Sequence, residues 1–334
     1  MEIKTLGIDI AKRVFQLHGV DAKGKVVLKK RLSREALPNF MANLPSCTIG
    51  MESCSGSNYW ARKFRSYGHE VKLMSPQYVK PYVKTNKTDA NDAEAICEAV
   101  TRPNMRFVSI KSAEQQDIQS LHRYRQRVVE ERTALVNQIR GLLTEYGIVI
   151  PQGIGFLRKK LPEVLEEENS EITPLSREIF IQLSEDLKGI DQKVKSLDKR
   201  IDTLCKQSED CQRIVQIAGI GALTATALVS SIGDITTFQN GRHLSAWLGL
   251  VPREYSSGNK RMLLGISKRG DRYLRTLLIH GARAFISFAK KRSVWLEDLV
   301  RRCGKQKAYV ALANKNARIV WALLAKQTEY KPAC

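Results

Sequence analysis

Met1-Glu-Ile-Lys-Thr-Leu-Gly-Ile-Asp9-Ile10 is a short, mostly apolar run of the kind that forms a buried β-strand. Gly7 leaves room for another backbone or a phosphate to approach closely, and Asp9 places a carboxylate on the strand. A second compact apolar run, Thr48-Ile-Gly-Met-Glu52, repeats this arrangement and also ends in an acid. The sequence therefore predicts two buried strands, each carrying an acid near its end.

The segments around these two runs predict the order strand, strand, strand, helix, strand, helix, strand, helix. Residues 15–20 and 26–28 are expected to form an antiparallel meander with the first strand, and residues 71–74 the fifth strand. Apolar residues at positions 37, 40, 41 and 44 have helical spacing, a second helix follows Glu52, and Thr88 or Asn86 can cap a third. This order is that of an α/β ribonuclease-H-like fold, in which the first and fourth strands lie side by side.

Two more acids, Asp89 and Asp92, stand three residues apart at the start of the third predicted helix and so share one helical face. In a ribonuclease-H-like layout they converge with Asp9 and Glu52. Clustered carboxylates repel one another unless a hard cation neutralises them, and two such ions about 4 Å apart stabilise an in-line phosphoryl displacement. Any one of these acids is equally consistent with ordinary solvated surface, but the four together predict a magnesium site. Glu94 is expected to point away from the shared face into solvent.

The charge balance indicates a polyanionic partner. The chain of 334 residues contains 55 Lys and Arg against 34 Asp and Glu, a formal net charge of +21. Because the bases are dispersed through sequence that looks folded, nucleic acid is favoured over a membrane, and its binding should depend strongly on salt. The length predicts two or three domains.

The cysteines and the apolar segments exclude several classes of protein. Seven cysteines without a CxxC pair predict a reducing, cytoplasmic environment, with neither a disulfide framework nor a zinc site. Cys54 has no histidine nearby in sequence and is expected to pack rather than to act as a nucleophile. No signal peptide is apparent, and the apolar stretch 277–289 is interrupted by Arg283, so no membrane span is expected.

Two long heptad patterns follow the first domain. Apolar residues recur every seven positions at 121, 128, 135 and 142, and alternate spacings of four and three between Leu183 and Leu204. The two patterns predict an antiparallel helical hairpin or a dimerising arm. One long helix on a globular core is the alternative. The predicted domains are residues 1–112, 113–207 and 208–334.

The last region, predicted to be mainly α-helical, combines a Gly-x-Gly turn with a basic segment. Residues 217–221 are similar to a helix-hairpin-helix element, whose turn amides can hold a phosphate, although such turns often serve only tight packing. A flexible polar loop is expected around Ser257, where a hydroxyl beside clustered bases suits attack on a phosphate or its binding. The residues expected to contact nucleic acid are Lys87, Gly219, Gly221, Arg253, Lys260, Arg261, Lys268, Arg269, Arg272 and Arg275.

With these motifs together, the whole chain resembles the DEDD transposases of bacterial insertion sequences, which have a RuvC-like N-terminal domain and a C-terminal transposase domain. The resemblance rests on Gly-Ile-Asp9-Ile-Ala-Lys, Met-Glu52-Ser, Asn-Lys-Thr-Asp89-Ala-Asn-Asp92-Ala, Ala-Gly-Ile-Gly221 and Gly-Leu-Val-Pro-Arg-Glu-Tyr-Ser-Ser257-Gly.

This resemblance implies a site-specific DNA recombinase, directed by a structured guide RNA that the non-coding end of the element encodes. It implies Asp9, Glu52, Asp89 and Asp92 as ligands of magnesium, for which manganese can substitute, and Ser257 as the nucleophile that forms a covalent phosphoserine link to DNA. It also implies an active site shared between subunits, hence a dimer or tetramer, acting on the element ends and a target in the bacterial cytoplasm at the nucleoid. Ser256 stands directly before Ser257 and carries the same hydroxyl.

Two other functions fit parts of the same sequence. A hydrolytic junction-resolving nuclease would use the four acids and an activated water, and its products would carry free ends. A non-catalytic nucleic-acid-binding scaffold would need only the basic surface and the coiled coil, and would tolerate loss of Asp9 or Asp92.

Overall fold

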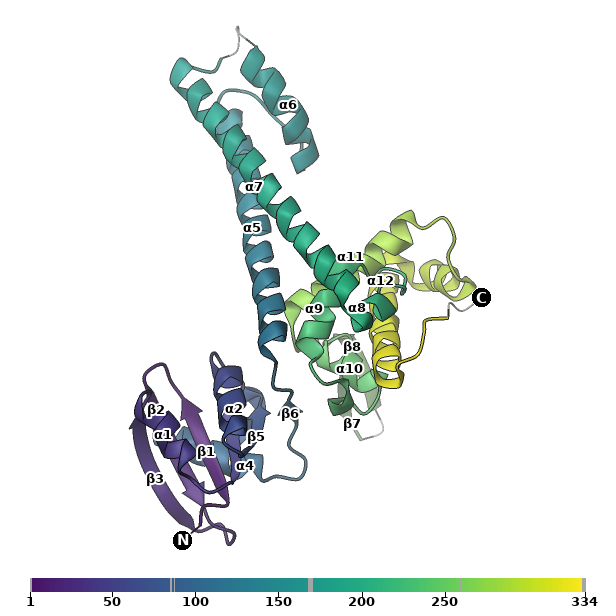
Figure 1. Cartoon of the computed structure of the whole chain (residues 1–334). Helices are drawn as coiled ribbons and strands as arrows, with labels where there is room; N and C mark the ends of the chain where they lie inside the picture. Colours follow the sequence, from purple (N-terminus) through teal and green to yellow (C-terminus); the bar gives the residue numbers. More distant parts are fainter. Residues whose placement is uncertain (1, 85, 87, 168–170, 259, 332–334) are drawn as a thin grey trace. The chain divides into compact units, whose positions relative to one another are not determined.

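The computed structural model describes residues 2–84, 86, 88–167, 171–258 and 260–331. These residues form two compact units (Figure 1). The first contains Met1–Gln115 together with Ser231–Gln239, and the second contains Gln116–Ser230 and Asn240–Cys334. The division into three domains at residues 112 and 207 stays a proposal.

The first unit is built on a six-stranded mixed sheet with the strand order β3-β2-β1-β4-β5-β6. β1 is antiparallel to β2 and parallel to β4, which is parallel to β5, as the ribonuclease-H-like prediction requires. The two-residue β6, antiparallel to β5, was not predicted because it is too short for a periodic signal. The strands are β1 (Thr5–Ile10), β2 (Val14–Val20), β3 (Val26–Ser33), β4 (Thr48–Glu52), β5 (Glu70–Met74) and β6 (Phe107–Val108).

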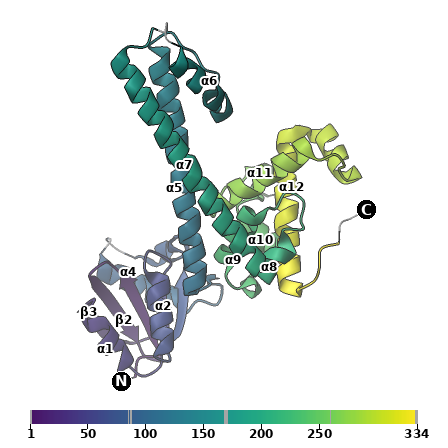
Figure 2. The same ribbon diagram turned by 45° about the horizontal axis from the view of Figure 1, so that its top comes forward.

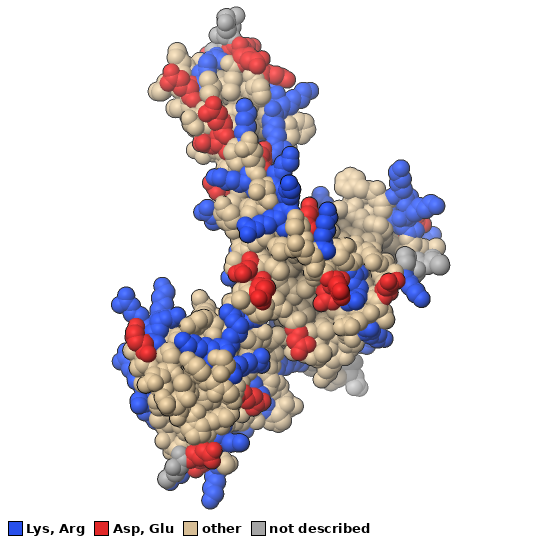
Figure 3. All heavy atoms as spheres, in the orientation of Figure 1, with Lys and Arg blue, Asp and Glu red and all other residues tan. Residues whose placement is uncertain are grey.

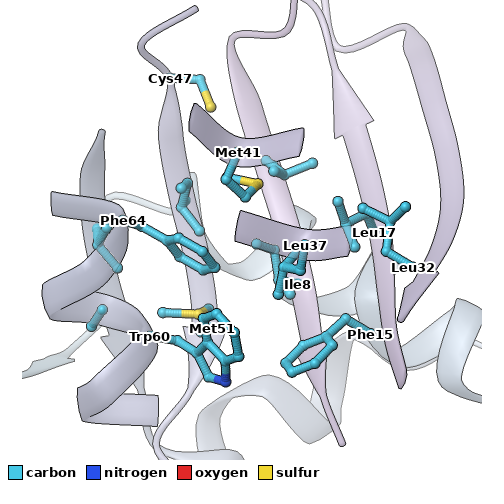
Figure 4. Close-up of a cluster of buried hydrophobic side chains, with 14 of the residues drawn as sticks. Ile8, Phe15, Leu17, Leu32, Leu37, Met41, Cys47, Met51, Trp60 and Phe64 are labelled. Carbon is cyan, nitrogen blue, oxygen red and sulfur yellow. The ribbon is translucent and has the colours of Figure 1, made fainter. Parts of the chain in front are cut away.

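One face of this sheet packs against α1 (Ala36–Ala42) and α2 (Ser57–Ser66). Strand alternation sends one row of side chains from neighbouring strands, among them Leu17, Ile8 and Met51, into this layer. Figure 4 shows Met51 beside Trp60 and Phe64 of α2, and Ile8 beside Leu37 of α1. The resulting core fixes the register of β1 against β4, because a one-residue slip would expose every one of these side chains.

The opposite face is covered by α4 (Asp89–Val100), which lies directly on the strands. A methyl group on Gly7 would collide with the backbone of Ala93 and would lie 2.5 Å from Cys97 N, and one on Gly50 would lie 2.8 Å from Val100 Cβ. The two glycines therefore let the helix approach the sheet. A short helix α3 (Pro76–Val79) and the 3₁₀ turns η1 (Lys80–Tyr82) and η2 (Ile235–Thr237) complete this unit.

From Gln116 on, α5 (Ala113–Thr144) belongs to the second unit, where it pairs with α7 (Pro174–Gln207) to form an arm. The two helices run side by side in Figures 1 and 2. Arg125 pairs with Asp198 and Arg132 with Asp191, so seven residues forward in α5 match seven backward in α7. The helices are therefore antiparallel, with Val128, Ile190, Val194 and Leu197 buried in the seam. α6 (Ile154–Glu166) packs against the joined end of the pair through Leu157 and Leu161.

The rest of the second unit is mainly helical. Residues predicted as a flexible loop around Ser257 instead form an antiparallel hairpin of β7 (Pro252–Ser257) and β8 (Lys260–Ile266). Its strands are almost wholly exposed, so they lack the apolar and polar alternation by which a strand is recognised. The helices are α8 (Glu209–Ile214), α9 (Ala222–Ile232), α10 (Gly241–Trp247), α11 (Arg272–Phe288) and α12 (Val294–Lys326), the last kinked at Gly304. In the described ranges no helix has the length and apolar character that a membrane span needs.

Candidate functional site

Two of the four predicted acids end neighbouring parallel strands. Ile8 of β1 pairs with Met51 of β4, so the next positions along the two strands are Asp9 and Glu52. Because successive side chains alternate, both acids project to the face opposite the Ile8 and Met51 core, which is the face of α4. Each is partly exposed. Parallel strands lie about 4.8 Å apart, so the two carboxylates start from adjacent backbone positions.

Helix α4 brings the other two acids to the same edge, because it runs antiparallel to β1. Cys97 lies at Thr5, where its Sγ is 3.8 Å from the carbonyl oxygen, and Ala93 lies at Gly7. Four helical residues advance about 6 Å and two strand residues about 6.6 Å, so the start of α4, with Asp89, lies toward the Asp9 end of β1.

The same geometry holds over β4. Gly50 faces Ile96 and Val100, so an earlier turn of the helix, with Asp92, lies toward the Glu52 end of β4. The four acids thus lie toward the same edge of the sheet, two from adjacent strands and two from the first turn of one helix. The helix begins where it does because Thr88 Oγ1 accepts a hydrogen bond from Asn91 N at 3.2 Å.

The charges of both Asp9 and Glu52 act on Cys54, which follows β4. Desolvation of its sulfur, followed by the charges of Glu52 and then Asp9, raises the pKa of the Cys54 thiol. The residue is exposed, so the expectation that it packs was wrong. Its raised pKa keeps it a thiol at neutral pH, which makes it a poor nucleophile.

The donor set suits a hard divalent cation, since all four groups are carboxylates. Within the described ranges no three His, Cys, Asp or Glu side chains are grouped closely enough to hold a metal ion as they stand. The four acids therefore share an edge without a closed coordination shell. Glu94 lies apart from them, partly exposed and 3.9 Å from both His18 Nδ1 and Lys29 Nζ.

The two candidate nucleophiles differ in their surroundings on the β7–β8 hairpin. Ser256 Oγ donates to Glu254 Oε1 at 3.0 Å, and Arg261 Nε donates to the same oxygen at 3.1 Å. Ser257 pairs with Lys260 in the strand register and projects from the other face of the hairpin. Both serines are exposed.

The predicted nucleic-acid contacts fall into three groups. Exposed side chains belong to Arg253, Lys260, Arg261, Lys268, Arg269 and Arg272. Arg275 is partly buried and donates to the carbonyl oxygens of Leu248 and Arg269 at 3.2 Å each, so it holds two segments of this unit together. Lys87 lies outside the described residues. Figure 3 shows Lys and Arg spread over the visible surface of both units.

The predicted Gly-x-Gly turn connects α8 and α9, and its first glycine serves packing. Gly219 has a positive φ of 85°, and a methyl group there would lie 2.8 Å from Gly281 O of α11. Gly221 has open space around it. Close backbone packing therefore explains Gly219, and phosphate binding by the turn amides stays a prediction.

The second unit contains a buried polar cluster that the sequence did not predict. The ring nitrogens of His122 lie 3.0 Å from Tyr273 Oη and 3.0 Å from Thr226 Oγ1, which ties α5 to α11 and α9. Burial, with a smaller effect of Arg125, lowers the pKa of His122 to about 4. Its partners are more than a hundred residues away along the chain, so no local pattern indicates them.

Comparisons with known proteins show that the chain is similar to transposases. Residues 6–148 match a DEDD transposase profile, described as transposase, and residues 211–295 match one described as transposase of the IS116/IS110/IS902 family. The chain is 48% identical to the transposase for insertion sequence element IS1111A of Coxiella burnetii, over 99% of this chain and 92% of the relative. It is 46% identical to a probable family 20 transposase of Pseudomonas aeruginosa, over 99% and 100% of the two chains. It is 39% identical to the transposase for insertion sequence element IS1328 of Yersinia enterocolitica, over 98% of each.

Proposed function

Because this chain belongs to the IS116/IS110/IS902 family of transposases, an enzyme with a DEDD nuclease domain that acts on DNA, we propose that it is an RNA-guided recombinase. It cuts and rejoins DNA strands through a covalent phosphoserine intermediate. The proposal is supported by the placement of the four acids toward one edge of the sheet, where Asp9 and Glu52 end adjacent parallel strands under α4.

The four acids position the scissile phosphate. A DEDD nuclease domain implies a divalent metal, and carboxylate oxygens at the edge of the sheet favour magnesium. A bound ion would supply charge neutralisation and stabilise the attacking and leaving oxygens. The strand ends fix Asp9 and Glu52, while α4 presents Asp89 and Asp92 from the other side, so the phosphate is held between rigid elements.

Ser257 supplies the nucleophile. Its Oγ forms a bond to phosphorus as the bond to the leaving deoxyribose oxygen breaks, and the hydroxyl proton ends on that oxygen. The reverse attack by a DNA hydroxyl then rejoins a strand and frees the serine. Exposure of the hairpin and the exposed Lys260 beside Ser257 support this role.

Ser256 is the second candidate, because its hydroxyl already donates to the Glu254 carboxylate. A carboxylate in that position can accept the proton of an attacking hydroxyl. The paired Arg261 favours a structural role for the same carboxylate, since it draws Glu254 into an ion pair.

The assembly is a homodimer or tetramer in which the acids of one subunit act with the serine of another. Acids and serine belong to different compact units of the chain, which supports an exchange of units between subunits. The arm of α5 and α7 provides a means of exchange. A guide RNA and the two DNA partners account for the net charge of +21.

The test uses 5′-labelled element-end DNA, guide RNA and magnesium. Wild-type protein is expected to give a covalent protein–DNA adduct, Ser256→Ala to retain it and Ser257→Ala to lose it. Asp9→Asn and Asp92→Asn are expected to abolish both cutting and adduct. An adduct that persists in Ser257→Ala would overturn the serine assignment. Free cut ends without an adduct would instead support the hydrolytic nuclease. Absence of cutting by the wild-type protein, with nucleic-acid binding equal in wild type and Asp9→Asn, would support a scaffold.

A further inference from the structure

The row of side chains that contains Asp9 continues away from Glu52 onto the outer strands. In the sheet register Asp9 pairs with Gln16 of β2, and Gln16 pairs with Arg31 of β3. Side chains directly paired across strands project to the same face. Arg31, Gln16, Asp9 and Glu52 therefore lie in one line across the face on which α4 lies.

This row is open to solvent, unlike the row beside it. The neighbouring row holds Lys29, His18 and Gly7, of which His18 is buried and Gly7 lies under α4. In the Asp9 row, by contrast, Gln16 is partly exposed and Arg31 is exposed. A ligand approaching the acids can therefore lie along the Asp9 row.

Arg31 differs from the other bases of its strand in what it contacts. Lys29 lies 3.9 Å from Glu94, and Lys30 lies on the opposite face with its Nζ 4.8 Å from the Phe40 ring centre. Arg31 makes no ion pair with any described residue. A guanidinium left in solvent on the acid-bearing face is available to an external anion.

The distance between Arg31 and Asp9 indicates which phosphate of a bound DNA strand Arg31 can hold. Two strand spacings of about 4.8 Å place the Arg31 and Asp9 backbones roughly 10 Å apart, so Arg31 stands two strands away from the acid. A phosphate held by Arg31 would lie next to the reacting phosphate, not at it. Guanidinium groups bind phosphate oxygens through two parallel hydrogen bonds, which fixes position as well as affinity.

We propose that Arg31 is a positioning residue that holds a backbone phosphate of the DNA strand being cut, next to the phosphate that the acids engage. Gln16, between Arg31 and Asp9, lines the path of that strand. The proposal rests on the proposed function, because it takes the four acids as the place where DNA is cut.

The experiment compares Arg31→Ala with Lys30→Ala, an identical loss of charge one residue away on the other face. DNA affinity is measured in the Asp9→Asn background against salt concentration, and cutting is measured with Asp9 intact. Arg31→Ala is expected to weaken DNA binding about tenfold or more and to reduce the salt slope by about one. Its KM for DNA should rise more than its kcat falls. Arg31→Lys should restore the salt slope but only part of the affinity, and Lys30→Ala should bind as the parent does.

Each result bears on one claim. Equal effects of Arg31→Ala and Lys30→Ala on DNA binding would overturn the role of Arg31, and so would a loss confined to guide RNA binding. Retained cutting by Asp9→Asn would instead overturn the proposed function, whatever Arg31 does. Both residues are exposed, and a urea unfolding midpoint equal to that of wild type would confirm that each variant is folded.

Discussion

Replacing Gly7 with alanine should displace α4 from the sheet, and so lower both the stability of the protein and its rate of DNA cutting. The added methyl would lie 2.5 Å from Cys97 N and would also meet Ala93 O, both in the α4 backbone, which cannot rotate away. Ordinary contact begins at 3.4 Å, so the helix must move off the sheet by roughly 1 Å. Overpacking of this kind costs about 1–3 kcal/mol of folding free energy. A displacement of about 1 Å at a reacting centre costs on the order of 100-fold in rate.

Urea unfolding and the cutting rate are measured on the same samples, with Gly19→Ala as the control. A methyl on Gly19 would meet only side chains, Leu28 Cβ at 3.1 Å and Ile3 Cδ1 at 3.3 Å, away from the acids. We expect it to cost less than about 1 kcal/mol and to leave the cutting rate nearly unchanged. If Gly7→Ala is as stable and as fast as wild type, α4 does not rest on β1 through this glycine, and the derived placement of Asp89 and Asp92 toward the ends of β1 and β4 fails.

Three further predictions follow from other sites. The pKa of His122 falls from 6.5 to about 4 on folding, so about 3 kcal/mol of folding free energy is lost as the pH falls from 6.5 to 4. Urea unfolding should show about 2 kcal/mol of this loss between pH 7.5 and pH 5 in wild type, and a flatter dependence in His122→Gln. Asp191→Ala should cost about 1 kcal/mol in the same assay, because it removes the partner of Arg132 at 3.2 Å and of Arg158 at 2.7 Å in a partly exposed network. Cys54→Ser should cut DNA at the wild-type rate, and iodoacetamide should modify wild-type Cys54 more slowly than free cysteine, because its pKa is raised.

The first unit could be predicted closely from its sequence because each element carries its own local signal. The apolar runs that end at Asp9 and Glu52 are buried strands, and Thr88 caps the helix that presents Asp89. The position of β1 beside β4 was predicted from the order of strands and helices along the chain. The two apolar segments alone would fit several orders of strands in the sheet.

The rest of the site depends on contacts that no local pattern encodes. The exposed strands β7 and β8 lack the alternation of apolar and polar residues that would have predicted their hairpin. His122 meets Tyr273 only through tertiary packing. Nothing in the sequence distinguishes Arg31 from the other basic residues. Only the pairing of β1 with β2 and of β2 with β3 shows that it lies in line with Asp9. Helix periodicity indicates which side chains are buried, but only the pairing of strands shows which exposed ones act together.

The antiparallel register of α5 and α7 also constrains how this arm can change in length. A seven-residue deletion made in both helices at paired positions would shorten the arm by about 10 Å and leave its seam intact. The same deletion in one helix alone would mismatch pairs such as Arg132 with Asp191 along the remaining length. Insertions and deletions should therefore be tolerated only when both helices gain or lose seven residues at paired positions. The length of the arm would then vary in steps of one heptad.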